Sequence, residues 1–223
     1  MKIPEGFRLD LARRVQSELA RKVVESPLGE VDVVAGVDVA YAGDIAYSAA
    51  VAYSLKRGRV VGSACSINKV VFPYIPTLLS FRELMPMVRA LRRLSTQFDV
   101  VMIDGQGVAH PFRLGIAAHL GVVLGVSSIG VAKSKLYGEV VGNKLVDPRG
   151  GVIGAVVKCK KQLYVSVGNR ISLDEAVALV KSLCTNSTMP LPILLAHNKA
   201  NEVKAKRGMS ATFDKWGEAD CSA

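Results

Sequence analysis

The order of the apolar segments is the feature that most limits how this chain can fold. Three apolar, β-branched runs follow one another at residues 31–41, 46–55 and 59–70, and the turn Lys56-Arg57-Gly58 separates the last two. This order predicts a meander of three adjacent strands. From residue 80 onward, helical and strand-like segments alternate. The sequence therefore predicts an α/β fold with a mixed central β-sheet flanked by helices.

Periodicity places the other expected elements. Helices are expected at 7–24, 80–97, 113–120 and 192–206, and another that starts at Ser172 or Asp174 and runs through Leu183. Strands are expected at 99–103, 152–158 and 163–167, and 122–131 is an apolar, partly strand-like segment. The chain has 223 residues, 50% of them hydrophobic, which is enough to bury one sizeable core. We therefore expect residues 1–223 to form a single domain that ends in a loose tail at 217–223.

Charge and composition indicate where the protein is found in the cell more clearly than what it binds. Lysine and arginine total 29 against 19 acidic residues, so the formal net charge is +10 and polyanions are attracted. Basic residues also serve thermal stability, and charge alone therefore names no partner. The N-terminus has no secretory pattern and no apolar run reaches the ~18 residues of a membrane span, so we expect a cytoplasmic protein without membrane contact. The cysteines lack metal-binding spacing and are expected to be buried free thiols: Cys65, Cys159, Cys184 and Cys221.

Two aspartates stand in apolar strand segments. Asp38 lies inside the run 33–39, and Asp104 closes the run that begins at Val100. Burying a carboxylate costs free energy unless something pairs with it. Two such groups on neighbouring strands suggest Mg²⁺, which prefers hard oxygen ligands and keeps several waters. The alternative is that each aspartate only ends a strand or caps a turn.

The segment 73–83 carries two further signals. Ser80 and Glu83 have the spacing of a helix capping box, and these residues alone favour that role for Glu83. Tyr74 stands between Pro73 and Pro76, and the prolines hold its ring at a rigid loop tip, as a base-unstacking wedge requires. A buried tyrosine in an ordinary loop is the alternative.

Other polar residues are less specific. Gly105 and Gly107 allow a ligand to approach the backbone closely, although loops use glycine in any case. His119 is expected to be a packed core histidine. Lys133 follows an apolar strand, where it can neutralise a phosphate or simply be solvated. His197 can reach a site from the last helix.

In order and spacing, these segments resemble the endonuclease V family. The resemblance spans most of the chain, and the combination of the tyrosine between two prolines with Ser80-Phe81-Arg82-Glu83 is highly specific. The matching segments are Gly36-Val37-Asp38, Pro73-Tyr74-Ile75-Pro76, Leu79-Ser80-Phe81-Arg82-Glu83, Asp104-Gly105-Gln106-Gly107, His110-Pro111, Gly130-Val131-Ala132-Lys133 and Ala196-His197.

The resemblance implies a ribonuclease H-like fold and a monomeric DNA repair endonuclease. Such an enzyme hydrolyses the second phosphodiester bond 3′ to deaminated adenine (deoxyinosine, with hypoxanthine as its base) with Mg²⁺, or Mn²⁺ in its place. It implies a catalytic role for Glu83 instead of capping, within the set Asp38, Glu83, Asp104, Lys133 and His197, of which Asp38 and Asp104 bind the metal. It also implies a DNA wedge (Pro73, Tyr74, Ile75 and Pro76) and a lesion pocket (Leu79, Gly105, Gly107 and His110).

Three positions depart from the family pattern. Thr77 replaces a usual glycine, Phe112 replaces a common arginine, and Asn169 stands where the family has histidine, so the detail of the pocket stays open. An inosine-specific endoribonuclease and a non-catalytic nucleic-acid-binding module remain alternatives. A phosphotransferase of the actin-like ATPase superfamily would need phosphate-loop glycine signatures that the sequence lacks.

Overall fold

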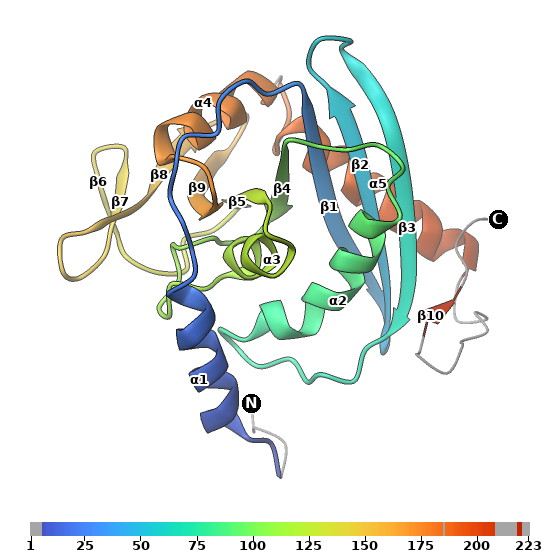
Figure 1. Cartoon of the computed structure of the whole chain (residues 1–223), viewed down its shortest axis with the longest axis horizontal. Coiled ribbons are helices and arrows are strands. Elements are labelled where there is room, and N and C mark those ends of the chain that lie inside the picture. The colour runs from blue at the N-terminus through green and yellow to red at the C-terminus, as the bar shows by residue number, and fades with distance from the viewer. Residues whose placement is uncertain (1–5, 185, 208–217, 220–223) are drawn as a thin grey trace.

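The computed structural model of the chain describes residues 6–184, 186–207 and 218–219 (Figure 1). Its helices are α1 (Leu9–Ala20), α2 (Leu79–Arg92), α3 (Ile116–Leu124), α4 (Leu173–Leu183) and α5 (Leu191–Arg207). Its strands are β1 (Val33–Ala42), β2 (Ile45–Ser54), β3 (Arg59–Lys69), β4 (Val100–Asp104), β5 (Ser127–Ala132), β6 (Glu139–Val141), β7 (Lys144–Val146), β8 (Val152–Lys158), β9 (Gln162–Asn169) and β10 (Glu218–Ala219).

Within the described ranges, ten strands form one mixed sheet in the order β10-β3-β2-β1-β4-β5-β9-β8-β7-β6. The predicted meander is confirmed, because β1, β2 and β3 pair antiparallel in sequence order. The central strands β1, β4 and β5 are parallel, and the remaining pairs are antiparallel. The predicted α/β fold with a mixed central sheet is therefore confirmed.

Helices cover both faces of the sheet (Figure 1). On one face, residues of α2 and α3 such as Met87 and Leu120 pack with Val37 and Ile103. On the other, residues of α4 and α5 such as Val180 and Ile193 pack against β1, β4 and β9. Successive strand side chains alternate between the two faces, so each central strand contributes to both cores and reads as a continuous apolar run.

The register of the two central strands brings the two aspartates together. Val37 of β1 pairs with Ile103 of the parallel strand β4. Asp38 and Asp104 are the next residues along these adjacent strands, which lie ~4.8 Å apart in a sheet. Both side chains therefore emerge at the same place, where β4 ends.

Several predicted boundaries shift. The segment 122–131 was expected to be one strand-like unit, but the structure divides it between the end of α3 and β5, with a left-handed turn at Gly125 (φ 68°) that ends the helix. The helix expected from residue 113 begins at Ile116. The β6–β7 hairpin was not predicted: all three residues of β6 are exposed and only Leu145 of β7 is buried.

The expectation of free thiols is wrong for the described cysteines. Cys159 at the end of β8 and Cys184 after α4 form a disulfide bond, with their Cα atoms 5.5 Å apart. Cys65 on β3 is also disulfide-bonded. The bond between Cys159 and Cys184 joins two elements, β8 and α4, that also pack against each other.

Both ends of the chain are only partly described. Of the tail expected at 217–223, Glu218 and Ala219 pair with Asn68 and Ile67 at the edge of the sheet, and the rest lies outside the described residues. In the part of the chain that the structure describes, no helix combines the length and the apolar character that crossing a membrane requires.

Candidate active site

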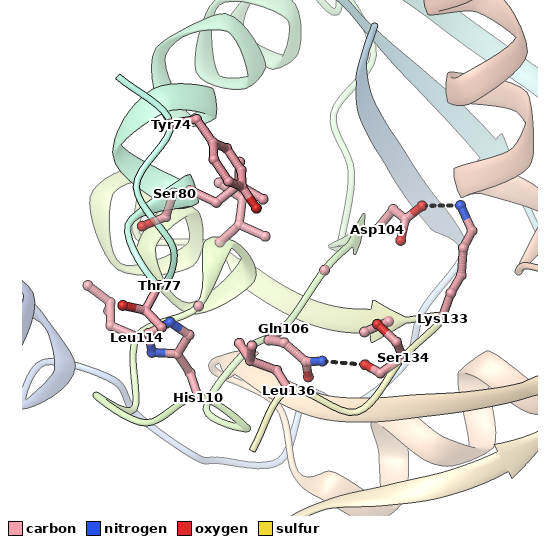
Figure 2. Close-up of a pocket in the computed structure, with 15 residues that line it drawn as sticks. Tyr74, Thr77, Ser80, Asp104, Gln106, His110, Leu114, Lys133, Ser134 and Leu136 are labelled. Carbon is pink, nitrogen blue, oxygen red and sulfur yellow. Dashed lines mark hydrogen bonds and ion pairs between the residues drawn. The ribbon is translucent and has the colours of Figure 1, made fainter. Parts of the chain in front are cut away.

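Asp38 and Asp104 each hold a basic partner. Nδ1 of His197, on α5, lies 2.7 Å from Asp38 Oδ2. Lys133, just beyond β5, donates from Nζ to Asp104 Oδ2 at 2.5 Å (Figure 2). Each carboxylate is therefore hydrogen-bonded to a basic side chain from a different part of the fold. The predicted residues Asp38, Asp104, Lys133 and His197 lie together at one place.

The contacts of His197 favour one tautomer of its imidazole ring. Its Nε2 lies 3.2 Å from Asn201 Nδ2, which can only donate, so Nε2 accepts and Nδ1 carries the hydrogen toward Asp38. The Asp38 carboxylate thus fixes the imidazole tautomer and its orientation.

Glu83 joins this cluster from α2. Burial raises its pKa to about 7, and the negative charges of Asp38 and Asp104 add to the effect. Burial also raises the pKa of Asp38, with a contribution from Asp104. Repulsion of this kind arises only between neighbouring carboxylates. Three acidic groups therefore share one small region.

The capping role favoured for Ser80 and Glu83 is wrong. Leu78 is the N-cap of α2 and makes no side-chain cap bond, and Ser80 lies within the first turn. The Ser80 hydroxyl is buried and lies 3.0 Å from His119 Nδ1. His119 is 3% exposed and its pKa is lowered by burial to about 4, which confirms its place in the core. Glu83 therefore does not cap α2.

A cavity of about 410 Å³ opens beside Asp104 (Figure 2). One wall is the segment that contains Tyr74, Thr77 and Leu79, and another is the turn that contains His110 and Leu114. Asp104, Gly105 and Lys133 also line it, so the cavity is continuous with the acidic cluster. Its size suits one small planar ligand.

The predicted wedge is anchored on one side and open on the other. Tyr74 is 52% exposed, whereas Ile75 is 5% exposed and packs with Ala12 and Leu78. Neighbouring aromatic rings extend this small core, since Phe72 stacks on Phe81. The Tyr74 loop (residues 72–78) therefore presents its aromatic ring from a fixed base.

The cavity walls offer specific polar groups. Burial lowers the pKa of His110 to about 4, so this ring is neutral, and its Nδ1 accepts the backbone N–H of Phe112. Gln106 donates from Nε2 to Ser134 O at 3.0 Å, which leaves Oε1 as a buried acceptor without a partner among the described residues. A buried unpaired acceptor favours a ligand that brings a donor.

Gly107 occupies a different place from the other predicted pocket residues. Leu79, Gly105 and His110 line the cavity, but Gly107 does not. A Cβ at Gly107 would lie 2.0 Å from Val167 O, so the glycine is required for packing against β9.

The three departures from the family pattern have identifiable contacts. Thr77 Oγ1 accepts a hydrogen bond from Arg13 of α1, and the Arg13 guanidinium lies 4.0 Å from the Phe112 ring centroid. Asn169 instead binds three backbone groups, of Val24, Gly121 and Val126, and has a structural role. Arg13 was not among the predicted site residues, because a basic residue on an amphipathic helix carries no local signal of such contacts.

The acidic cluster has the chemistry of a hard-cation site. No group of three or more His, Cys, Asp or Glu side chains in the described ranges is arranged closely enough to hold a metal ion. Asp38 and Asp104 nevertheless supply two adjacent carboxylates, and Mg²⁺ is often bound through one or two carboxylates while it keeps its waters. Burial, and after it repulsion between neighbouring carboxylates, raises the pKa values of Glu83 and Asp38, and a cation held between these groups would offset both effects. The residues present therefore fit Mg²⁺.

Comparisons with known proteins identify the family of this chain. The sequence model of the Endonuclease V family matches residues 17–198. Endonuclease V of Thermofilum pendens is 44% identical over 88% of this chain and 89% of the relative, and that of Rippkaea orientalis is 37% identical over 93% and 100%.

Solved structures give the same result. The crystal structure of Endonuclease V from Streptomyces avermitilis has a TM-score of 0.82 at 34% identity, and covers 92% of this chain and 97% of its own. A variant of the Ciona intestinalis enzyme, in complex with a 23mer DNA containing an inosine followed by a ribo-adenosine, has a TM-score of 0.82 at 28% identity, with 92% and 99% covered. The fold is therefore ribonuclease H-like, as expected, and the chain is a member of the Endonuclease V family.

Proposed function

We propose that this protein is a Mg²⁺-dependent repair endonuclease that recognises deoxyinosine in DNA. It hydrolyses the second phosphodiester bond 3′ to the lesion and leaves the altered base in place. The observation that carries the proposal is the meeting of three carboxylates at the end of a cavity whose wall presents an exposed tyrosine. Membership of the Endonuclease V family and the inosine-containing DNA bound by the Ciona intestinalis relative support it.

Asp38 and Asp104 would hold the cation, with Glu83 beside them. When bound, Mg²⁺ lowers the pKa of a water molecule and neutralises charge that develops on the phosphate. Glu83, with a pKa of about 7 in the cation-free site, gives up its proton when positive charge arrives. The acidic cluster is thus matched to a divalent cation, and Mn²⁺ can replace Mg²⁺ because it prefers the same oxygen ligands.

His197 and Lys133 act on the reacting groups. Since Nδ1 of His197 holds its hydrogen against Asp38, Nε2 is the basic nitrogen and accepts a proton from the attacking water once it leaves Asn201. Lys133 reaches the cluster with a side chain that is 57% exposed, so its ammonium group can turn from Asp104 to the scissile phosphate. Water attacks phosphorus in line with the departing 3′ oxygen, which takes up a proton from solvent as the P–O bond breaks, so no covalent nucleophile is needed.

The cavity takes the displaced base. Hypoxanthine pairs poorly with its partner, which lowers the cost of extruding it, and Tyr74 fills the gap that it leaves. Hypoxanthine carries an N1–H donor where adenine carries an acceptor, and Gln106 Oε1 supplies the missing partner for that donor. The net charge of +10 attracts the phosphate backbone and makes binding sensitive to salt.

The test is a nicking assay with purified protein. Duplexes with one deoxyinosine are compared with undamaged duplexes of the same sequence, with Mg²⁺ and with EDTA. We expect Mg²⁺-dependent nicking of the inosine duplex only, and its loss in Asp104→Asn and Asp38→Ala proteins that remain folded. Asp174→Asn, on an exposed first turn of α4, removes the same charge elsewhere and should nick normally. Retained cleavage by either active-site variant would overturn the metal assignment, and binding without nicking would favour a non-catalytic module.

A further inference from the structure

Helix α1 contacts the cavity although it lies apart from the acidic cluster. Arg13 donates from Nη2 to Thr77 Oγ1 at 2.6 Å and from Nη1 to Gln16 Oε1 at 2.8 Å. Gln16, which is fully buried, donates from Nε2 to Thr77 O at 3.0 Å and to Leu114 O at 3.3 Å. Each polar atom of the Gln16 amide is thereby used.

These bonds join two segments that line the cavity. Thr77 belongs to the Tyr74 loop, and Leu114 belongs to the turn that precedes α3; both line the cavity (Figure 2). Arg13 also reaches the second wall, because its guanidinium lies 4.0 Å from the Phe112 ring centroid. Arg13 and Gln16 therefore fix the separation of the two walls as well as their positions.

Thr77 has a backbone conformation that needs such support. Its φ is 67°, in the left-handed region that β-branched residues avoid. A strained residue keeps this conformation only where the surrounding structure imposes it. Arg13 bonds the Thr77 side chain and Gln16 bonds the Thr77 carbonyl. His110, which lines the cavity, also bonds the Thr77 backbone, so α1 supplies part of the restraint, and this part comes from outside the cavity lining.

The restraint passes directly to the wedge. Only Ile75 and Pro76 separate Thr77 from Tyr74, and Ile75 is buried against Ala12 of the same helix. A side chain that enters a base stack must be held in place beforehand, because ordering a mobile loop on binding subtracts from affinity. The exposed Tyr74 ring depends on α1 for this order.

We propose that Arg13 and Gln16 form a latch that holds the Tyr74 loop and the width of the cavity, and so determines lesion discrimination without taking part in cleavage. Both are positioning residues, since they act through Thr77, Leu114 and Phe112. This inference rests on the proposed function, because discrimination is measured as nicking at deoxyinosine.

The first experiment measures KM and kcat for Arg13→Ala on the deoxyinosine duplex and on the matched undamaged duplex, with Mg²⁺. Losing a hydrogen bond to a charged group corresponds to about a tenfold effect or more. We expect KM for the inosine duplex to rise about tenfold and kcat to stay within about twofold. Arg14→Ala removes the same charge from the neighbouring exposed position and should change neither, which separates the latch from general attraction to phosphate.

A double-variant test isolates the contact with Thr77. Thr77→Gly removes the hydroxyl and the strain, because glycine adopts positive φ without cost. In that background, Arg13→Ala should change KM by less than about threefold, since the main partner of Arg13 is already absent. An undiminished effect of Arg13→Ala in the Thr77→Gly protein would overturn the latch, as would equal KM for Arg13→Ala and Arg14→Ala or a fall in kcat at constant KM.

Hydrogen exchange keeps the inference separate from the proposed function. Amide exchange in residues 72–78 should be faster in Arg13→Ala than in Arg14→Ala, while exchange in β1 and β4 stays unchanged. This result can be obtained even if the wild-type protein does not nick deoxyinosine DNA. Unchanged exchange in residues 72–78 would contradict the latch whatever the substrate.

Discussion

Replacing Gly36 by alanine should lower the cleavage rate although Gly36 is not a site residue, because this glycine allows β1 and α5 to pack closely. A Cβ at Gly36 would lie 2.0 Å from the Pro192 carbonyl oxygen and 2.8 Å from the backbone nitrogen of Ile193. Ordinary van der Waals contact begins at 3.4 Å, so the Pro192 carbonyl has to move by about 1.4 Å. The first turn of α5 must move away from the sheet.

The same movement reaches the acidic cluster. Asp38 lies two residues after Gly36 on the same face of β1. Its Oδ2 is 2.7 Å from Nδ1 of His197, which is on α5. A displacement of more than 1 Å takes this contact beyond the ~3.2 Å limit of a good hydrogen bond. Misplacing a catalytic group by this much can lower the rate by about 100-fold.

The expected loss of stability is of moderate size. Overpacking a core costs about 1–3 kcal/mol. For a chain of this length each kcal/mol lowers the melting temperature by about 2–4 °C. Circular dichroism melts and urea unfolding measure the loss, and single-turnover nicking of a deoxyinosine duplex measures the rate.

The control is Gly43→Asn, in the turn between β1 and β2. Gly43 has φ 56° and no atom within 4 Å of an added Cβ, and asparagine tolerates this conformation. It should leave the nicking rate unchanged. Wild-type nicking and an unchanged melting temperature in Gly36→Ala would refute the reasoning, since α5 would then hold its place without the glycine.

Three further predictions concern the acidic cluster, the wedge and the disulfide. The pKa of Glu83 is raised to about 7 in the folded protein, so this group should lower the stability of the cation-free protein as pH rises from about 4.5 to about 7. For the same reason, Mn²⁺ should raise the melting temperature more at pH 8 than at pH 6. Glu83→Gln should flatten both dependences, and equal slopes in the two proteins would count against the shifted pKa. Tyr74→Ala should lower the preference for inosine over undamaged duplexes by about tenfold, because stacking of the ring on a base is lost. Mn²⁺ should still raise the melting temperature, because the Tyr74 side chain is 52% exposed and removed from the carboxylates. An unchanged preference would exclude the wedge role. The Cys159–Cys184 bond closes a sequence separation of 25, so Cys159→Ser/Cys184→Ser should lower the free energy of unfolding by about 3 kcal/mol in urea titrations, and equal midpoints would show that the bond adds no stability.

Local sequence patterns predicted the central strands and the two aspartates that they carry. Apolar runs placed the central strands, and carboxylates within those runs indicated Asp38 and Asp104 because a buried charge requires a partner. Glu83 illustrates the limit of this reasoning. The Ser-x-x-Glu spacing favours a cap, but α2 begins one residue before Ser80, and the hydroxyl turns to His119 instead.

Contacts between distant segments could not be predicted in this way. Arg13 and Thr77 are 64 residues apart, and Gln16 and Leu114 are 98 apart, so no periodicity relates them. The pairing of Cys159 with Cys184 likewise depends on α4 packing against β8. The β6–β7 hairpin was missed because its exposed residues give no core pattern.

Mapping the nick tests the central claim most directly. A duplex labelled at the 5′ end and carrying one deoxyinosine is incubated with the protein and Mg²⁺, beside an undamaged duplex and an inosine-containing RNA, and the products are sized on a denaturing gel. The account predicts a single product ending one nucleotide 3′ of the inosine, absent from the undamaged duplex, and the RNA lane ranks ribose against deoxyribose substrates. Products at scattered positions, or equal nicking of the undamaged duplex, would contradict it.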